Sequence, residues 1–328
     1  MIRCTLLRCG AILMGILAIR SALARTEPMR LETATGTLHG TLELPAGRGP
    51  FPVALIIAGS GPTDRNGNDK SLGLYTDCYK QLAQYLAQQG IASLRYDKRG
   101  AGDDFALAIP ENQLRFQTYV SDAVMWGKEL RRDPRFSTLT VIGHSEGALI
   151  GMLAAPKIPA AGFISVDGAS ERASRLLLTQ LKSRLPRNLY STAHAIVAQL
   201  RAGRTVARIP RSLMVLFRPS VQPYLISWFQ YDPVQEIAKL RIPIAIVQGE
   251  RDLQVPTRDA RTLYRAAPSA ELILIPDMNH VLKDVGPSDS DNISAYLKPG
   301  LPVDATMERS ITRFVLNLTS KRVSHHDK

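Results

Sequence analysis

Six short apolar segments of strand length recur along this chain and limit its fold more than any other feature. Each segment is continuously apolar, as expected for strands covered on both faces of a sheet. They occupy residues 52–58, 90–96, 138–142, 162–166, 243–247 and 271–275. Segments with helical periodicity separate or follow them, at 79–88, 116–132, 146–155, 257–267 and 306–318. This alternation predicts an α/β protein with a doubly wound, mainly parallel sheet.

The sheet is expected to begin with an antiparallel edge. Residues 31–35 and 37–44 alternate around Gly36 and are followed by Pro45, a pattern typical of a hairpin. Ligands of doubly wound sheets bind at the carboxyl ends of the strands. Candidate functional residues are therefore sought in the loops that follow each strand.

One stretch breaks the alternation. Residues 170–240 carry two helix-like segments and a proline-marked region where a strand is expected, which predicts a helical cap inserted into a core of 25–169 and 241–328. Between Glu171 and Arg218 the insertion carries ten basic residues against one acid, Glu171. They are Arg172, Arg175, Lys182, Arg184, Arg187, Arg201, Arg204, Arg208, Arg211 and Arg218. A solvated helical face and a charged substrate funnel both remain open interpretations.

The N-terminal sequence has the features of a cleavable signal peptide. Arg3 and Arg8 precede an apolar stretch at 10–19, and Ala22-Leu23-Ala24 matches a small-x-small cleavage pattern. We expect residues 1–24 to be a signal peptide cleaved after Ala24, which predicts a periplasmic or secreted protein. The apolar stretch is too short for an ordinary membrane span, so no stable span is expected after cleavage. An uncleaved N-terminal anchor is the alternative.

Cleavage would alter charge and thiol content. The segment holds three arginines and no acid, so the formal net charge would fall from +12 to +9. Cys4 and Cys9 would also leave, and Cys78 alone can form no intramolecular disulfide. We expect Cys78 to be a buried apolar residue. The arginines lack interleaved aromatic residues, so nucleic acid is not an expected partner.

The segment from Gly143 to Gly147 fits the pattern G-x-S-x-G, in which a strand turns sharply into a helix and exposes a serine. Ser145 is therefore a candidate nucleophile. A serine that only caps the following helix is the alternative for these five residues.

A serine nucleophile needs a base, and the base needs an acid that orients it. His280 follows the last predicted strand, and Asp252 follows the strand before it. Asp167, at the end of 162–166, is the rival acid. The order serine, aspartate, histidine matches one known arrangement of such triads. Other histidines are less suitably placed: His39 in the hairpin, His144 turned away inside the elbow, His194 in the cap, and His325 and His326 in the tail.

The loop after the first parallel strand is a candidate oxyanion hole. Gly59 and Gly61 flank Ser60, whose N–H would act together with that of Glu146, the residue after the nucleophile. A nucleotide-binding loop is disfavoured, because Asp64 stands where the third glycine of G-x-G-x-x-G is required.

Five motifs together resemble the α/β-hydrolase superfamily, and specifically bacterial esterase-type serine hydrolases, exported or cytosolic. They are AGSGPTDRNGN, RYDKRGAGDD, GHSEG, GERDLQVP and MNHVLK, spread over residues 58–283. The resemblance implies Ser145 as nucleophile, His280 as base, Asp252 as acid, Ser60 and Glu146 as amide donors, and no metal or organic cofactor. Asp97, Arg99, Gly100 and Gly102 match a loop that we interpret as structural. The oxyanion loop has Ala58-Gly59 where many members have His-Gly, which leaves the donor at Ser60 open.

The expected activity is hydrolysis of small carboxylic esters through an acyl-enzyme. Apolar helical faces in the cap suggest a modest pocket suited to acetyl to hexanoyl groups, although these faces could instead be the cap's own core. A peptidase or amidase of the same fold and a non-catalytic binding protein are the alternatives. The alcohol and the oligomeric state are not indicated by the sequence.

Overall fold

The computed structural model describes residues 24–326 apart from 108 and 183, and the side chains up to residue 320. The predicted signal peptide, with Cys4 and Cys9, lies outside the described residues except for Ala24. Within the described part of the chain, no helix is both long and apolar enough to cross a membrane.

Eight strands form one sheet in the order β1-β2-β4-β3-β5-β6-β7-β8. The strands are β1 (Arg25–Thr33), β2 (Gly36–Leu44), β3 (Phe51–Ile57), β4 (Ala92–Tyr96), β5 (Phe136–His144), β6 (Gly162–Val166), β7 (Ile244–Gly249) and β8 (Glu271–Ile275). The first two strands form the predicted hairpin, and β2 is also antiparallel to β4. All other pairs are parallel. The predicted doubly wound, mainly parallel sheet with an antiparallel edge is confirmed.

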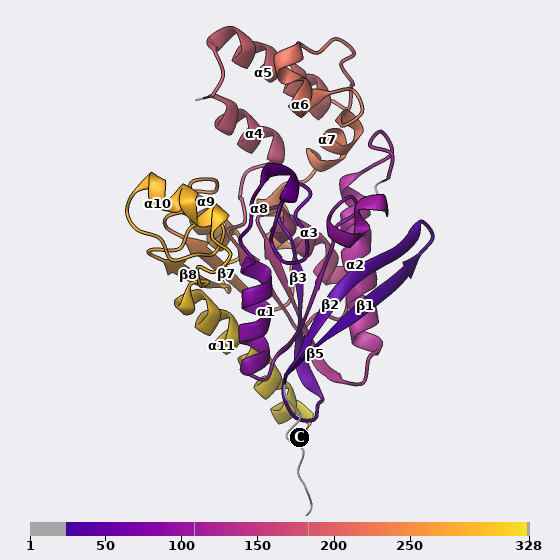
Figure 1. Ribbon diagram of the computed structural model, residues 1–328, viewed down its shortest axis with the longest axis vertical. Coiled ribbons are helices and arrows are strands. Elements are labelled where there is room, and N and C mark those ends of the chain that lie inside the picture. Colours follow the sequence, from indigo (N-terminus) through magenta and orange to yellow (C-terminus); the bar gives the residue numbers. More distant parts are fainter. Residues whose placement is uncertain (1–23, 108, 183, 327–328) are drawn as a thin grey trace, which may run out of the picture.

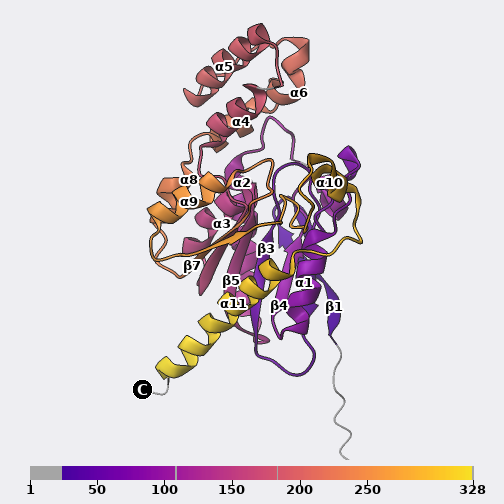
Figure 2. The ribbon, with the colours of Figure 1, turned by 90° about the vertical axis from the view of Figure 1, so that its left-hand side faces the viewer.

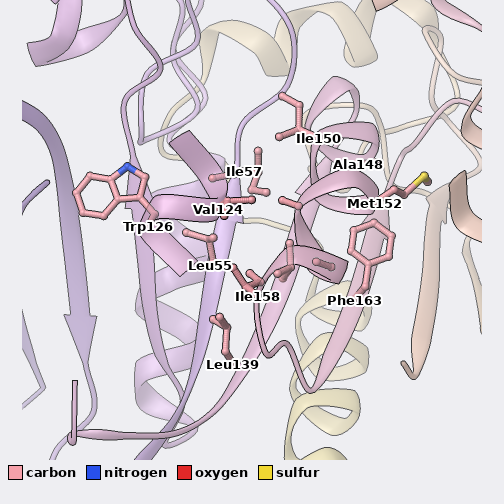
Figure 3. Close-up of a cluster of buried hydrophobic side chains, with 14 of the residues drawn as sticks. Leu55, Ile57, Val124, Trp126, Leu139, Ala148, Ile150, Met152, Ile158 and Phe163 are labelled. Carbon is pink, nitrogen blue, oxygen red and sulfur yellow. The ribbon is translucent and has the colours of Figure 1, made fainter. Parts of the chain in front are cut away.

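Helices cover both faces of the sheet (Figures 1 and 2). The main ones are α1 (Cys78–Gln88), α2 (Phe116–Arg132), α3 (Glu146–Ala154), α9 (Thr257–Ala266) and α11 (Ala305–His326). Successive residues of β3 point to opposite faces, so that Leu55 packs with α2 and α3 while Ile56 packs with α1 and α11. Figure 3 shows the first of these cores, with Trp126 and Phe163 both fully buried.

A second group of helices lies beyond one end of the sheet (Figure 1). It comprises α4 (Ala173–Lys182), α5 (Arg187–Arg201), α6 (Met214–Phe217) and α7 (Gln222–Trp228). These helices bury an apolar cluster of their own, which includes Ile196, Leu200 and Phe217. The next helix, α8 (Pro233–Ala238), packs instead against α3 and α9. The apolar faces of α4 and α5 are therefore largely occupied by packing within this group.

The remaining helical segments are short and lie in loops. They are η1 (Lys70–Leu72), η2 (Gly102–Leu107), η3 (Ala155–Lys157), η4 (Arg211–Leu213), α10 (Asp289–Ser294) and η5 (Ala295–Leu297).

Candidate active site

Ser145 lies at a sharp turn between β5 and α3. Its backbone has φ 54° and ψ −120°, a conformation that non-glycine residues rarely adopt. Its N–H donates to the carbonyl of Val166 at 2.9 Å, which ties the turn to the end of β6. Gly143 and Gly147 flank Ser145, and neither position has room for a Cβ atom. A Cβ on Gly143 would lie 2.2 Å from the Gly147 carbonyl oxygen, and one on Gly147 would lie 2.3 Å from the Ile57 carbonyl oxygen.

His280 and Asp252 form a buried pair in the loops after β8 and β7. The distance from His280 Nδ1 to Asp252 Oδ2 is 2.7 Å. Asp252 Oδ1 accepts from the backbone N–H groups of Gln254 (2.6 Å) and Val255 (2.9 Å), which fixes the carboxylate. Burial acts to raise the pKa of Asp252, but the charge and hydrogen bond of His280 outweigh it and lower the pKa. Burial acts to lower the pKa of His280, and Asp252 outweighs it and raises the pKa.

Ser145 and His280 line the same cavity, which measures about 710 Å³ and also contacts Ser60, Gln254 and Tyr296. Within the described part of the chain, the Ser145 hydroxyl makes no hydrogen bond to a protein group. Catalytic hydrogen bonds of this kind often tighten only when substrate binds. The structure thus brings the candidate nucleophile and base to one cavity without joining them directly.

Two backbone N–H groups next to Ser145 are free. The N–H groups of Ser60 and Glu146 donate to no backbone or side-chain acceptor among residues 24–326 that the structure describes. Both residues line a cavity together with Ser145. The N–H of Gly59 is not available, because it donates to the Tyr79 hydroxyl at 3.1 Å. These two free donors are what an oxyanion would require.

His144 has a role that sequence reasoning missed. Its Nε2 donates to the backbone carbonyl of His280 at 2.8 Å, because a carbonyl can only accept. Burial, followed by the neighbouring His280, lowers the pKa of His144 to about 3, so the ring is neutral and its Nδ1 accepts from the Tyr79 hydroxyl at 2.7 Å. Together with the hydrogen bond from Gly59 N–H to the Tyr79 hydroxyl, these bonds form a network. The network connects the candidate oxyanion loop, the elbow and the loop that carries His280.

Lys98 also reaches the site, from the loop interpreted as structural. Its buried ammonium donates to the Gly59 carbonyl and lies 3.5 Å from Glu146 Oε1. Glu146 Oε2 accepts from the hydroxyl of Tyr224 in α7 at 3.0 Å. A lysine inside RYDKRG was the only signal in the sequence. The other residues of this loop are structural: Asp97 accepts from the Arg65 N–H, and Arg99 forms a two-bond pair with Asp122.

A smaller apolar cavity opens on the other side of Ser145. It measures about 230 Å³. Its apolar walls are Leu149, Ala169, Ala173, Leu176, Leu177, Leu216, Leu225, Trp228, Pro233 and Val255. Most of these residues belong to α4, α6 and α7. Glu171 also lines the cavity, and its Oε2 is buried without a hydrogen-bond partner.

Asp167, the rival acid, is fully buried at the end of β6 and does not bond His280. With His144 and His280 it forms a group of three potential metal ligands whose ligand atoms lie within 4.8 Å of one another. Both nitrogens of His144 and Nδ1 of His280 are already in hydrogen bonds, so this group does not suit a metal ion. As expected for Cys78, its side chain is buried, and burial raises its thiol pKa to about 11.

His39 and His194 line neither cavity at Ser145, whereas Arg218 of the insertion lines the 710 Å³ cavity. His39 pairs with Asp104 at 2.6 Å, and His194 lies in α5. In the insertion, Arg218 pairs with Glu111 of the core, and Arg172 pairs with Asp232 at 3.2 Å. Some of the basic residues therefore serve as structural ion pairs.

Residues 72–283 match the family model described as serine aminopeptidase, S33. The chain belongs to this family of α/β-hydrolases. The matched region runs from just after the oxyanion loop to the histidine loop, and so contains the elbow, Asp252 and His280.

Similar proteins agree on this fold. The chain is 28% identical over 283 residues to esterase EstD of Thermotoga maritima, covering 85% of this chain but only 65% of the length of EstD. Among solved structures, it resembles Est1E from Butyrivibrio proteoclasticus (15% identity, TM-score 0.56, 89% of this chain and 99% of Est1E). It also resembles a thermophilic esterase from Thermogutta terrifontis (15% identity, TM-score 0.54, 89% and 99%).

Proposed function

We propose that this α/β-hydrolase is a serine carboxylesterase that cleaves small esters through an acyl-enzyme. The observation that carries the proposal is the strained elbow serine in one cavity with His280, which is paired with Asp252. Two backbone N–H groups that donate to no acceptor in the described part of the chain line a cavity with the same serine. The similarity to EstD, an esterase, supports it. A non-catalytic binding protein would need neither the strain at Ser145 nor a buried acid–base pair beside it.

In the proposed reaction, His280 Nε2 takes the hydroxyl proton of Ser145 while the serine oxygen attacks the ester carbonyl carbon. The N–H groups of Ser60 and Glu146 stabilise the oxyanion that forms. His280 then gives the proton to the leaving alcohol oxygen as the C–O bond breaks. Water, activated by His280, attacks the acyl-enzyme in the same way, and Ser145 is released with the acid. Asp252 holds the imidazole in the tautomer that carries the proton on Nδ1.

The positions of the two cavities distinguish the acyl and alcohol sides. The alcohol oxygen must lie near His280 to receive its proton, and His280 lines the 710 Å³ cavity but not the apolar one. The acyl group would then occupy the apolar cavity of about 230 Å³. This volume is below the roughly 300 Å³ at which drug-sized ligand pockets begin. Acetyl to hexanoyl esters are therefore the preferred substrates.

A series of p-nitrophenyl esters tests this proposal, with Ser145→Ala as the matched control. We expect kcat/KM to peak at or below the hexanoyl ester and to be lost in the variant. A peak at twelve carbons or more, or a rate jump above substrate solubility, would contradict the short-acyl assignment. Full activity in a folded Ser145→Ala protein would overturn the mechanism.

An aminopeptidase or amidase is the second candidate, and one observation favours it. Glu171 places a carboxylate in the acyl cavity with one buried, unpartnered oxygen, which could pair with a free amine. Aminoacyl-p-nitroanilides separate the two functions. Higher kcat/KM for these anilides than for acyl esters, lost on Glu171→Gln, would make the peptidase the better assignment.

We further propose that the protein is exported and that residues 1–24 are removed, on the basis of the N-terminal sequence alone. Mass spectrometry of the purified protein from the periplasm or medium should give Arg25 as the first residue. An intact Met1 on exported material would indicate an anchor instead.

A further inference from the structure

Asp167 is a buried acid that the proposed mechanism does not use. It follows β6, between the strands that carry Ser145 and Asp252, and its side chain is fully buried. Oδ1 accepts from the Gly249 N–H at 2.8 Å, whereas Oδ2 is buried without a hydrogen-bond partner. Its backbone φ of 48° is unusual for a non-glycine residue. A positive φ and a buried oxygen without a hydrogen bond both reduce the stability of the folded protein. Because Asp167 combines the two, we look for a functional role.

The carboxyl group lies close to the base. One oxygen of Asp167 lies within 4.8 Å of a ring nitrogen of His280. The titratable groups around it are Asp252, His280, His144, Tyr79 and Tyr296. His144 is neutral, and burial raises the pKa of both tyrosines, so Asp252 and His280 are the charged neighbours. Among the side chains that the structure describes, Asp252 and His280 are thus the charged groups that act most strongly on Asp167.

The two aspartates are not equivalent, because their surroundings differ. Asp252 has two N–H donors and the His280 hydrogen bond, all of which favour its ionised form. Asp167 has one N–H donor. Burial, followed by the Asp252 charge, raises the pKa of Asp167 well above its ordinary value. These surroundings favour the ionised form of Asp252 and the protonated form of Asp167.

We propose that Asp167 is a second positioning acid for His280, which takes over this role when the Asp252 carboxylate is absent. The inference rests on the proposed function, since it assigns to Asp167 a role in orienting His280, the proposed base. Removal of Asp252 would eliminate the charge that opposes ionisation of Asp167. The Asp167 carboxylate, with one oxygen within 4.8 Å of a His280 ring nitrogen, would then orient the imidazole.

The test compares ester hydrolysis by Asp252→Ala, Asp167→Asn and the double variant. In a triad with a single acid, loss of its charge costs about 10⁴-fold in kcat. We expect Asp252→Ala to lose only about 10²-fold, and the double variant to lose about 10⁴-fold. Asp167→Asn alone should stay within about threefold of the wild type, because an amide resembles the uncharged acid.

A pH series separates this role from a structural one. The ratio of kcat/KM for Asp252→Ala to that for the double variant should rise with pH through one ionisation, that of Asp167. If Asp252→Ala disturbs folding, Asp252→Ser provides the same comparison, because its hydroxyl can still accept from the N–H groups of Gln254 and Val255. The proposal would be overturned if adding Asp167→Asn to Asp252→Ala or to Asp252→Ser left the activity unchanged. It would also be overturned if the ratio of kcat/KM between the single and the double variant did not depend on pH. A wild type without ester activity would instead refute the proposed function.

Discussion

The backbone of Ser145 carries strain that its side chain cannot relieve. A residue with a Cβ at φ 54° costs about 1–3 kcal/mol. The turn nevertheless persists because Ser145 N–H bonds Val166 and because both flanking glycines admit close backbone contacts. In this strained conformation, Ser145 lines both cavities.

We predict that Ser145→Gly and Ser145→Ala both lose ester hydrolysis by several orders of magnitude. They should differ in stability, because glycine adopts positive φ without a Cβ clash. The free energy of unfolding of Ser145→Gly should exceed that of Ser145→Ala by about 1 kcal/mol. Urea titration of the two inactive proteins measures the difference, and equal stabilities would mean that the elbow is not strained.

The pH dependence of activity should follow His280. Burial and Asp252 act in opposite directions on its pKa, and Asp252 prevails, so the ring keeps its proton to higher pH than an ordinary histidine. Because only the neutral ring can accept the serine proton, kcat/KM should fall as the pH decreases through a midpoint above 6.5. A pH–rate profile measures this midpoint. His39→Gln, far from the site, should leave it unchanged, whereas a wild-type midpoint at or below 6.5 would refute the assignment.

At the scale of elements, the sequence predicted best those helices and strands whose bounds follow from the local spacing of apolar residues. The strand at 162–166 and the helix at 116–132 are found with those bounds. The elbow, Asp252 and His280 all follow strands, so topology alone placed them at one edge of the sheet. The strand predicted at 138–142 extends over Phe136–His144, because Phe136 pairs with β3 at one end and Gly143 and His144 pair with β6 at the other.

Long-range contacts were not accessible from the sequence. Tyr79 and His144 are 65 positions apart, and Tyr224 and Glu146 are 78 apart. Neither pair has a local spacing or charge pattern that would reveal it. Only the packing of α1 and α7 against the elbow brings them together. For the same reason the sequence left the two acids, Asp167 and Asp252, as rivals, since their separate hydrogen bonds depend on loop geometry.

Close packing of α3 against β3 gives an element-scale prediction. A Cβ on Gly147 would also approach the Ala58 carbonyl oxygen to 2.7 Å, so α3 could not remain against the oxyanion loop. We expect Gly147→Ala to lower the free energy of unfolding by at least about 1–3 kcal/mol and to reduce kcat at least tenfold. Gly300→Ala is the matched control, because nothing lies within 4 Å of its Cβ position. Similar thermal melts for both variants would contradict this packing argument.

At the scale of the whole molecule, the apolar cavity of about 230 Å³ is built by two separately packed parts. Leu149 and Val255 come from the sheet domain, while Leu176 and Leu225 come from the α4–α7 group, which has its own apolar cluster. Separate clusters of this kind can open at different free energies. The substrate cavity should therefore be lost before the sheet unfolds.

Phe217→Ala tests this difference in stability. Phe217 is fully buried in the α4–α7 cluster, and its truncation should cost that group about 3–5 kcal/mol. We expect ester hydrolysis to decline at a lower temperature than the far-UV circular dichroism signal. Phe163→Ala, in the sheet core, should lower both transitions together. Coincident transitions in Phe217→Ala would show that the molecule unfolds as one unit.

The order of the strands also has a consequence for synthesis. β5, β6, β7 and β8 are neighbours both in the chain and in the sheet, and the loops after them carry Ser145, Asp167, Asp252 and His280 in turn. A ribosome therefore releases the nucleophile first and the base last. A chain that ends before β8 has Ser145 but lacks His280, so an incomplete translation product has no base for the proposed mechanism and is expected to be inactive.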